Sequence, residues 1–385
     1  MRVAIDARYV REKPSGIGTY VQALVERLPA TAPDDRFCFW AHPLAPRPLS
    51  RASNTAEVVV RAGPNSPLPI WWPSRYASFD GVDVFHSPHN VLPRGVPCPT
   101  VVTVHDVMAI ERPGLHLQGL ERLVKQRYYS AAVWRAIRQA SHVIAPSRAV
   151  ADRITHLERS AARRLSVIYE AADPVFCPAP DRSHAAQRSA TLLGFDHPFL
   201  LVVGANSATK RHADAVAAFA ATVPEPWRLI LVQRQGASRQ LVRLARELGV
   251  AHRVLWLPRV RRSDIVTLMQ SAGALIQPSL YEGFGLPVIE AMACGCPVVA
   301  SDIAVFREIA GPAAAFVPPQ DVPRLGKTLG EVVRSPDRRR EMAAAGLDQA
   351  QRFSWQRCAT DTLDAYRSAA AGTTPHAQRP VHVPA

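Results

Sequence analysis

The sequence lacks the features that define membrane-spanning, secreted and metal-binding chains. No apolar run reaches the roughly 20 residues that a transmembrane helix needs. No basic-then-apolar leader opens the chain, because residues 2–6 predict a short strand. The six cysteines have no metal-type spacing, so we expect them to be reduced thiols. These absences favour a cytoplasmic protein, with peripheral contact at the inner face of the membrane as an open alternative.

Nucleic-acid motifs are also missing, although the net charge is +14. There is no zinc-finger spacing and no aromatic-rich motif of the common RNA-binding kind, so we expect no specific nucleic-acid partner. The excess of basic residues is seven in 1–180 and seven in 181–385, so no single basic tail carries it. Such a charge suits an anionic small molecule, a diphosphate lipid or a membrane surface. The alternative is an arginine-rich genome, since only four of the 46 basic residues are lysine.

What is present is a repeated alternation of strand-like and helix-like segments. At 385 residues the chain is long for one core, so two domains are expected. Residues 100–104 are continuous and β-branched, as in a buried parallel strand. Ser147 is a predicted N-cap for a helix to Leu157, and a long helix is predicted over 118–140. This alternation predicts an α/β fold with parallel sheets and helices on both faces.

The pattern divides the chain into five segments. The first domain is predicted over 1–175 and the second over 198–353, both doubly wound and Rossmann-like. A proline-containing segment with little apolar periodicity, 176–197, is predicted to link them. A last helix is predicted over 354–370. The tail, 371–385, is rich in proline and alanine, and we expect it to be disordered.

The most informative stretch is Glu282-Gly-Phe-Gly-Leu-Pro-Val-Ile-Glu290. Two carboxylates lie eight positions apart on a glycine-rich turn and the helix that follows it. The proline suits the first helical turn, where its missing N–H costs nothing. Glycines leave backbone N–H groups accessible, and a helix N-terminus favours an anion. The stretch therefore predicts a site for a nucleotide sugar, which has hydroxyls at both ends and phosphate between them.

Residues 278–301, which contain this stretch, resemble the donor-site signature of the retaining glycosyltransferases of family 4. The resemblance implies the GT-B fold, in which two Rossmann-like domains face a cleft. It implies that the first domain binds the acceptor and the second binds the nucleotide sugar. It also implies that the last helix crosses back to the first domain.

The resemblance assigns donor-side roles to several matching residues. Glu290 would accept hydrogen bonds from ribose hydroxyls, and Glu282 would contact the transferred sugar. The backbone at Gly283, Phe284, Gly285 and Leu286 would hold the distal phosphate.

Basic and glycine positions complete the expected donor site. Lys210 lies where a diphosphate needs neutralising. The family often carries Pro-Arg-Lys-Asn there, and we expect Arg211 to substitute for the arginine that this chain lacks before the lysine. Gly16 and Gly18 resemble the family's first glycine loop, which faces the donor; a simple turn is the alternative.

The strand ends of the first domain supply the remaining candidates. His105 follows a buried strand, where open α/β sheets bind ligands, and it matches the family's strand-end histidine. It is therefore predicted to be catalytic together with Lys210 and Glu282. Asp106 could orient it or cap the next turn. His86 and Asn90 are acceptor-side candidates.

The predicted function is transfer of a hexose to a glycan or a polyprenyl-diphosphate-linked acceptor in surface polysaccharide synthesis. The opening Ile-Asp-Ala-Arg and Gly-Ile-Gly-x-Tyr resemble mannosyltransferases that use GDP-mannose, and a UDP-sugar is the close alternative. A GT-B sugar-nucleotide epimerase and a non-catalytic binder of anionic polymers remain open. Because the chain has no Asp-x-Asp triplet, we expect neither a catalytic metal nor a cofactor.

One further segment, Pro67-Leu-Pro-Ile-Trp-Trp-Pro73, has two adjacent tryptophans among prolines. They could touch a lipid surface or a polyprenyl-linked acceptor. Inward packing at a helix start is the interpretation that we prefer.

Overall fold

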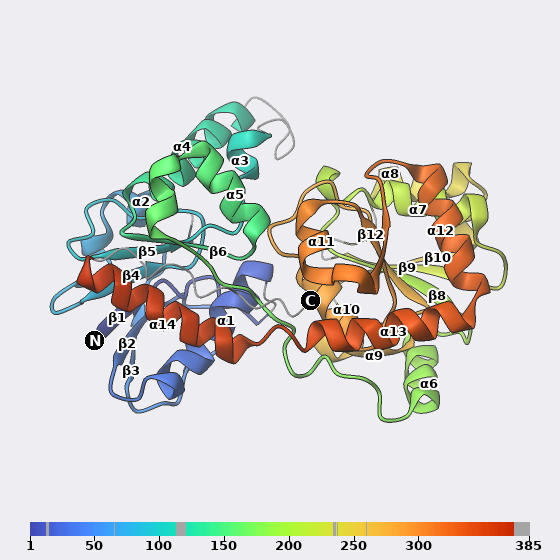
Figure 1. The fold of residues 1–385 in the computed structure, drawn as a ribbon, viewed down its shortest axis with the longest axis horizontal. Helices are drawn as coiled ribbons and strands as arrows, with labels where there is room; N and C mark the ends of the chain where they lie inside the picture. Colours follow the sequence, from blue (N-terminus) through green and yellow to red (C-terminus); the bar gives the residue numbers. More distant parts are fainter. Residues whose placement is uncertain are drawn as a thin grey trace. The chain divides into compact units, whose positions relative to one another are not determined.

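The computed structural model describes residues 1–12, 15–64, 66–112, 121–233, 236, 238–258 and 260–372. The chain forms two compact units. Unit 1 consists of Met1–Glu170 and the chain from Ser354 onward, and unit 2 consists of Ala171–Phe353 (Figure 1). Each unit contains one sheet whose described strand pairs are all parallel. The predicted α/β architecture of two parallel-sheet domains is therefore confirmed.

Unit 1 has a seven-stranded sheet in the order β3-β2-β1-β4-β5-β6-β7. Its strands are β1 (Arg2–Ile5), β2 (Arg36–Ala41), β3 (Thr55–Val59), β4 (Val84–Ser87), β5 (Thr100–Thr103), β6 (His142–Ala145) and β7 (Leu165–Val167). The strand order reverses beside β1, which pairs with β2 on one side and β4 on the other. Loops that leave the carboxyl ends of strands at such a point can surround a ligand.

Helices cover the sheet of unit 1. They are α1 (Gly16–Thr31), α2 (Pro67–Trp71), α3 (Met108–Glu111), α4 (Glu121–Gln139), α5 (Arg148–Leu157) and α14 (Trp355–Ala371). Ser147 caps α5 by accepting from the Val150 N–H, as predicted. Helix α14, the last of the chain, packs along α1 and over β4, β5 and β6 (Figure 1). The chain therefore returns to unit 1 after completing unit 2.

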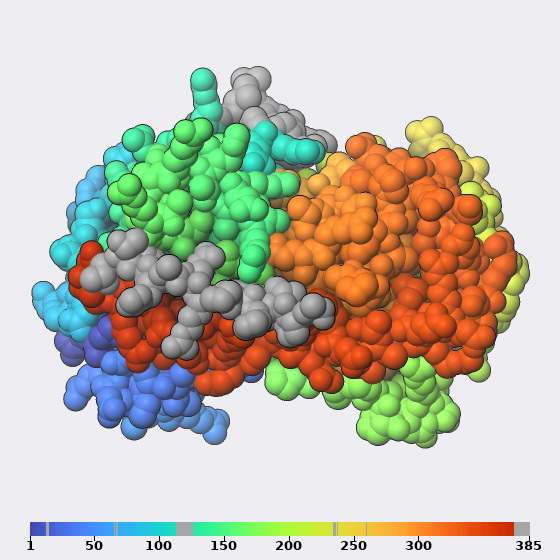
Figure 2. Space-filling view, in the orientation of Figure 1, coloured from blue at the N-terminus to red at the C-terminus, as the bar shows by residue number. Residues whose placement is uncertain are grey.

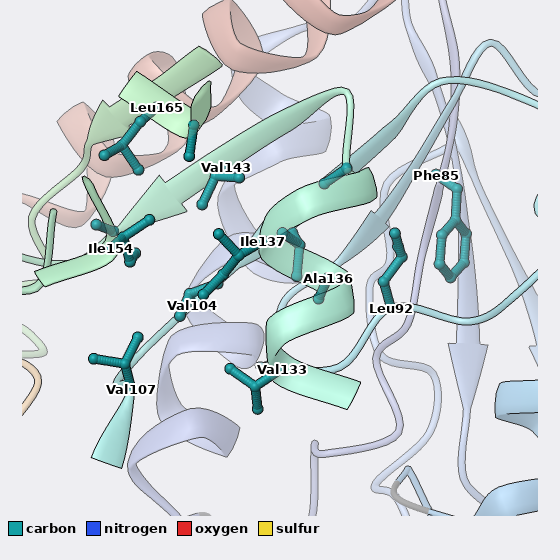
Figure 3. Close-up of a cluster of buried hydrophobic side chains, with 14 of the residues drawn as sticks. Phe85, Leu92, Val104, Val107, Val133, Ala136, Ile137, Val143, Ile154 and Leu165 are labelled. Atoms are coloured by element: carbon teal, nitrogen blue, oxygen red, sulfur yellow. The ribbon is translucent and has the colours of Figure 1, made fainter. Parts of the chain in front are cut away.

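The core of unit 1 shows why the helices remain on the sheet. Val133, Ala136 and Ile137 form one face of α4, and all three are buried (Figure 3). They pack in one cluster with Val104 and Val143, which lie at the end of β5 and on β6. Burying a side chain of valine or isoleucine size stabilises a fold by about 1.5–3 kcal/mol. Their helical spacing thus fixes α4 against the strands.

Unit 2 has a six-stranded sheet in the order β10-β9-β8-β11-β12-β13. Its strands are β8 (Phe199–Val203), β9 (Arg228–Gln233), β10 (Val254–Pro258), β11 (Ala274–Gln277), β12 (Val298–Ser301) and β13 (Ala314–Val317). Its helices are α6 (Arg182–Leu193), α7 (His212–Thr222), α8 (Arg239–Glu247), α9 (Arg262–Ser271), α10 (Leu286–Ala293), α11 (Ala304–Ala310), α12 (Val322–Arg334) and α13 (Pro336–Ala350). Here the order reverses between β8 and β11, so the loops after these two strands are neighbours.

The segment predicted as a linker contains a helix. Helix α6 begins after Asp181, whose side chain accepts from the Ser183 N–H, and ends at Gly194 in the left-handed conformation. It packs on α9 and buries little more than Ala185 and Ser189. Such a narrow buried face gives a weak periodic signal, which explains why the sequence pattern did not reveal it.

Two other predictions extend beyond the described residues. The predicted helix over 118–140 is described from Glu121, and residues 113–120 lie outside. Helix α14 ends at Ala371, and nearly all of the tail predicted to be disordered, 373–385, also lies outside the described residues.

Candidate functional site

The turn before α10 is shaped by a glycine that no other residue can replace without strain. Gly285 has φ +102°, and an added Cβ would lie 2.7 Å from the Phe306 ring. Both the backbone conformation and the close approach therefore require glycine. Pro287 follows in the first turn of α10, as the sequence predicted. The turn directs the chain from β11 into α10 and leaves Glu282 at the carboxyl end of the strand.

Glu282 is the centre of a polar cluster in unit 2. Lys210 Nζ donates to both of its carboxylate oxygens. Ser279 Oγ donates to Glu282 Oε1 at 2.8 Å, and Gln277 Nε2 lies 3.1 Å from the same oxygen. The Glu282 side chain is 9% exposed and the Lys210 side chain 23%. The predicted pair of Lys210 and Glu282 is thus brought into direct contact, with Ser279 and Gln277 as additional partners.

Two loops meet to make this cluster. Lys210 ends a 3₁₀ turn, Ala208–Lys210, that follows β8, whereas Glu282 follows β11. The Leu280 N–H donates to the Thr209 carbonyl at 2.8 Å and joins the loops directly. Since β8 and β11 are adjacent where the strand order reverses, the sheet topology itself brings cation and carboxylate together.

The cluster retains unused hydrogen-bonding capacity. The Gln277 side chain is buried, and its Oε1 has no hydrogen-bond partner in the described part of the chain. A buried amide oxygen without a partner costs about 1–3 kcal/mol. Because this oxygen is itself buried, a ligand hydroxyl or a water could satisfy it only after the side chains around it move.

In unit 1, His105 lies between two acceptors. Its Nδ1 is 3.1 Å from Glu170 Oε1, and its Nε2 is 3.1 Å from the Pro88 carbonyl oxygen. A backbone carbonyl can only accept, so Nε2 carries a proton, and we infer that Nδ1 donates to the Glu170 carboxylate, which makes the ring an imidazolium. Burial opposes this charge, but the Glu170 carboxylate raises the pKa of His105 above its ordinary value. Both ring nitrogens of His105 are thus already used within unit 1.

The neighbours of His105 serve mainly to position its backbone. Asn90 Oδ1 accepts from the His105 N–H at 2.7 Å. Asp106 Oδ1 accepts from the Met108 N–H at 3.0 Å and thus caps the next turn, which was one of its two predicted roles. The Tyr20 ring meets the imidazole edge-on, with centroids 4.9 Å apart.

His86 is held in the interior of unit 1. Its Nδ1 is 2.7 Å from the Tyr366 hydroxyl on α14, and its Nε2 is 2.9 Å from Thr103 Oγ1. The side chain is fully buried, and burial lowers the pKa of His86 to about 3. A neutral imidazole with both nitrogens bonded connects α14 to the sheet. The structure places no free ring nitrogen here for the acceptor contact that we predicted.

Gly16 and Gly18 are the first and third residues of α1. Ser15 Oγ accepts from the Gly18 N–H at 3.1 Å, so this donor is capped within the chain. Gly16 is exposed and Gly18 is buried. Of the two, only Gly16 presents an open surface at the helix N-terminus.

Two family models match the chain, one to each unit. Residues 14–176 match a glycosyltransferase family 4 model, and residues 184–349 match a model of glycosyl transferases group 1. This chain belongs to the family 4, group 1 glycosyltransferases.

Curated relatives of this glycosyltransferase share limited stretches with it. An O-antigen chain mannosyltransferase B of Escherichia coli is 38% identical over 114 residues, which is 30% of each chain. A MMP alpha-(1->4)-mannosyltransferase of Mycolicibacterium hassiacum is 38% identical over 133 residues, 34% of this chain and 32% of the relative. The chain thus spans about a third of the length of these relatives in the matched regions.

Solved structures share the whole fold at low sequence identity. A sucrose-phosphate synthase from Thermosynechococcus elongatus superposes with a TM-score of 0.75 at 22% identity, covering 97% of this chain and 100% of that one. HepE of Anabaena, solved with UDP and glucose, superposes with a TM-score of 0.71 at 19% identity. The match covers 96% of this chain and 100% of HepE. The predicted GT-B fold is confirmed.

Arg211 of this glycosyltransferase has a partner within unit 2. It adopts φ +50°, and its guanidinium makes two hydrogen bonds to Asp214, at 2.7 and 2.8 Å. The arginine that we expected to replace a missing diphosphate contact is therefore already paired on α7. Lys210 is the cation that stays nearer to Glu282.

The other predicted donor residues lie on the turn and on α10. Phe284 is buried and meets Phe353 edge-on at 5.8 Å, so its ring supports the turn. Leu286 begins α10 and Glu290, half-buried, is its fifth residue. Gly283, also half-buried, directly follows Glu282.

The sequence analysis missed His212, the first residue of α7. Gln233 at the end of β9 lies 2.6 Å from its Nδ1, and both side chains are buried. Burial, and secondarily the charge of Lys210, lowers the pKa of His212 to about 4, so the ring is neutral at pH 7. Its place directly after Lys210-Arg211 was the only signal available.

A second missed cluster lies at the end of β1. Arg8 and Asp6 are completely buried and form a bidentate ion pair, at 2.6 and 2.7 Å. His89 Nε2 lies 3.1 Å from Asp6 Oδ2. Although burial opposes ionisation, Arg8 and His89 hold the pKa of Asp6 well below its usual range. The Ile-Asp-Ala-Arg opening thus forms an internal ion pair.

The tryptophan pair is exposed, contrary to the inward packing that we preferred. Trp71 is 41% exposed, Trp72 57% and Leu68 54%, while Ile70 packs in a buried cluster with Val91 and Ala132. The Arg94 guanidinium lies 3.7 Å from the centroid of the Trp71 ring. Five residues are too few to bury both faces of a helix, so one face remains in solvent.

The described residues contain neither a candidate metal site nor a candidate membrane span. No group of three or more His, Cys, Asp or Glu side chains there is placed to hold a metal ion. No helix there is long and apolar enough to cross a membrane.

Proposed function

We propose that this protein transfers a hexose from a nucleotide sugar to a glycan or lipid-linked acceptor, with retention of anomeric configuration. The observation that carries the proposal is the cluster of Lys210, Glu282, Ser279 and Gln277 at the reversal of strand order in unit 2. Clusters at such points bind ligands in open α/β sheets. Family membership supports glycosyl transfer as the chemistry.

Each member of the cluster has a proposed role. Glu282, held by three donors, accepts hydrogen bonds from hydroxyls of the transferred sugar. Lys210 neutralises the diphosphate, aided by backbone N–H groups at the start of α10. Glu290, farther along α10, binds the ribose hydroxyls. Because these groups are positioned before the donor binds, little reorganisation is needed when charge develops on the leaving group.

The proposed reaction proceeds on one face of the sugar. The bond from the anomeric carbon to the diphosphate oxygen breaks, and the bond from that carbon to the acceptor oxygen forms. The acceptor proton passes to the departing phosphate oxygen. Since the chain lacks an Asp-x-Asp triplet, we assign charge stabilisation to Lys210 and N–H groups instead of a divalent cation. His105, whose N–H groups are both bonded, contributes a fixed positive charge.

We propose mannose from GDP-mannose as the donor and a growing surface polysaccharide as the acceptor. Support comes from the relatives named as mannosyltransferases, one of Escherichia coli and one of Salmonella typhimurium that is 27% identical over 61% of both chains. A UDP-sugar is the alternative, because HepE has a similar fold and was solved with UDP and glucose.

The deciding experiment measures thermal shift with GDP, UDP, ADP and their sugar conjugates, followed by product analysis with and without an acceptor. One nucleotide class should stabilise the protein, and Lys210→Ala and Glu282→Ala should remove transfer without unfolding it. Product formed without acceptor would indicate an epimerase or a hydrolase. No shift with any nucleotide would favour a binder of anionic polymers.

The exposed face of α2 favours one addition, peripheral contact with an anionic membrane. Trp71, Trp72 and Leu68 present apolar surface beside the cationic Arg94, and tryptophan with arginine is common at membrane interfaces. Flotation with anionic and zwitterionic vesicles tests this. Trp72→Ala should reduce binding to anionic vesicles, and equal flotation of the two proteins would remove the idea. Cytoplasmic location remains a prediction.

A further inference from the structure

An open pocket of about 360 Å³ lies in unit 2, away from the cluster around Glu282. Pro198, Gly273 and Pro297 line it, and each lies directly before the start of β8, β11 or β12. The pocket is therefore at the amino-terminal edge of the sheet, whereas Lys210 and Glu282 follow the carboxyl ends of β8 and β11. Helices α6 and α13 form its sides, and both lie on the face shown in Figure 2 (green and red).

The polar part of this pocket is cationic. Arg182 comes from α6, Arg339 and Arg340 come from α13, and no acidic residue lines the pocket. Arg340 pairs with Asp337, whose side chain is 78% exposed, and one nitrogen of Arg339 donates to two backbone carbonyls. The exposed Arg182 side chain makes no hydrogen bond or ion pair within the described part of the chain. At least one guanidinium at the pocket is thus available to an anion.

Helix geometry adds to the positive potential. Arg182 and Pro336 are the first residues of α6 and α13, and both line the pocket. The N-terminal ends of two helices therefore meet there, and each carries a partial positive charge that favours an anion. The capping Asp181 offsets part of this charge at α6.

Apart from Gln270 and Ser271, the rest of the lining is apolar. The Trp227 ring packs on Gly273, where an added Cβ would lie 2.4 Å from the ring, and Arg339 lies 5.3 Å from its centroid. Alanine and proline side chains from α6, α13 and the strand starts complete the walls. Ser271 also lines the pocket, but its Oγ is buried away from the pocket surface. A ligand with an anionic end and a compact body would match the cationic and the apolar parts of the lining.

We propose that this pocket is a second ligand site, which binds a small phosphate monoester such as a hexose phosphate or a nucleoside monophosphate. The phosphate would lie on the guanidinium groups, since arginine matches phosphate geometry with paired N–H donors. The body of the ligand lies against Trp227. The volume is within the ~300–1,000 Å³ range of small-molecule sites.

Calorimetric titration of the full chain tests the proposal. The probes are glucose 1-phosphate, AMP, inorganic phosphate and, as a neutral probe, glucose. The two esters should bind more tightly than inorganic phosphate, and glucose should not bind. Equal binding of glucose, or no binding of either ester, would overturn the proposal.

Variants locate the binding. Arg182→Gln should weaken ester binding at least about tenfold, because it removes a charge-assisted hydrogen bond. Arg188→Gln is the matched control: the same charge is lost from the same exposed helix, but Arg188 does not line the pocket. Ala186→Trp should block binding by filling the pocket without changing charge. Equal effects of Arg182→Gln and Arg188→Gln would indicate nonspecific attraction and contradict the site.

A further variant distinguishes ester binding at this pocket from binding at the proposed donor site. Lys210→Ala should leave ester binding unchanged, because Lys210 is at the other edge of the sheet. If Lys210→Ala abolishes ester binding while Arg182→Gln does not, the esters bind at the donor cluster and the second site is wrong.

Discussion

The two units use buried polar side chains in different ways at the carboxyl ends of their strands. In unit 1, both ring nitrogens of His105 and of His86 are bonded to other groups of the same unit. In unit 2, the cluster around Glu282 leaves Gln277 Oε1 without a partner in the described residues, and Lys210 is partly exposed. The first arrangement is complete without a ligand, whereas the second has capacity that a ligand can use.

This difference predicts whether a substitution changes mainly the stability of the fold or mainly ligand binding. Removing one partner from a saturated buried pair leaves the other without its hydrogen bond, which destabilises the fold. Removing a member of a partly solvated cluster changes ligand binding more than stability. The contrast applies to His105 and His86 and not to every buried polar group of unit 1: among the described residues, His89 Nδ1 and the indole nitrogens of Trp40 and Trp355 are buried without a partner.

The largest effect is expected for Glu282→Gln. The substitution keeps the shape but removes the charge that Lys210 contacts and the acceptor proposed for the sugar hydroxyls. We expect kcat/KM for transfer to fall about 10²–10³-fold, as for loss of one preorganised contact in an active site. Because Lys210 stays partly solvated, the free energy of unfolding should change by about 1 kcal/mol or less. Initial rates and urea unfolding measure both, and normal turnover with lost stability would reverse the comparison.

The next largest effect is expected for Glu170→Gln in unit 1, which should lower the free energy of unfolding. His105 would lose an ionised acceptor, which costs about 1.5–3 kcal/mol. Because Glu170 raises the pKa of His105 above the ordinary 6.5, its contribution is complete below pH 6.5 and is lost as pH rises through the raised pKa. Urea unfolding at pH 6 and pH 9 should show a larger difference from wild type at pH 6.

Glu111→Gln is the matched control for Glu170→Gln. Glu111 pairs with Arg153 at the surface of the same unit, and such pairs contribute little. A Glu170→Gln difference that does not depend on pH would show that His105 is not the cation we infer.

The sequence predicted which residues follow the strand ends, but not which side chains they bond to. Alternation placed β5, β8 and β11, and the family resemblance then selected His105, Lys210 and Glu282 on the loops that follow. Glu170 lies 65 residues after His105, so only folding of β7 beside β6 identifies it as a partner. Partner choice depends on neighbours in space, and periodicity contains no such information.

Two predictions from local sequence were wrong: the free side chain expected for Arg211 and the inward packing expected for Trp71 and Trp72. Arg211 has an acidic residue three positions ahead, at Asp214 on the first turn of α7, and this spacing already favoured an internal pair. The exposure of Trp71 and Trp72 could not be predicted, because it depends on how little of the five-residue α2 is covered by its neighbours in space, Val91 and Ala132.

Acid should destabilise both units, but unit 1 more. Burial lowers the pKa of His86 to about 3 and those of His142 and His212 to about 4, against 6.5 when unfolded. The unfolded chain therefore binds protons that the folded chain does not, and stability falls as pH drops from 6.5 towards 4. Each histidine contributes up to about 1.4 kcal/mol per pH unit.

Urea unfolding at pH 7, 6 and 5 measures how the free energy of unfolding changes with pH. Single variants show how much each histidine contributes to that change. His142→Gln removes one of the two buried unit 1 histidines named above, and His212→Gln removes the one named in unit 2. Each variant should reduce the pH dependence of the free energy of unfolding by about the contribution of one histidine. An unchanged slope in either would mean that the ring is solvated and titrates normally.

The smallest effect, and the sharpest test of the comparison, is expected for Ser279→Ala. It removes one of the donors to Glu282, while Lys210 and Gln277 keep the carboxylate in place. Losing one hydrogen bond of this kind costs about 0.5–1.5 kcal/mol, so donor affinity should fall about 2- to 12-fold. Ser183→Ala, which removes a hydroxyl from an exposed helix start in the same unit, should leave affinity unchanged. If Ser279→Ala instead lowers the free energy of unfolding and leaves donor affinity intact, the cluster in unit 2 is as self-contained as the histidines of unit 1, and the contrast between the units is wrong.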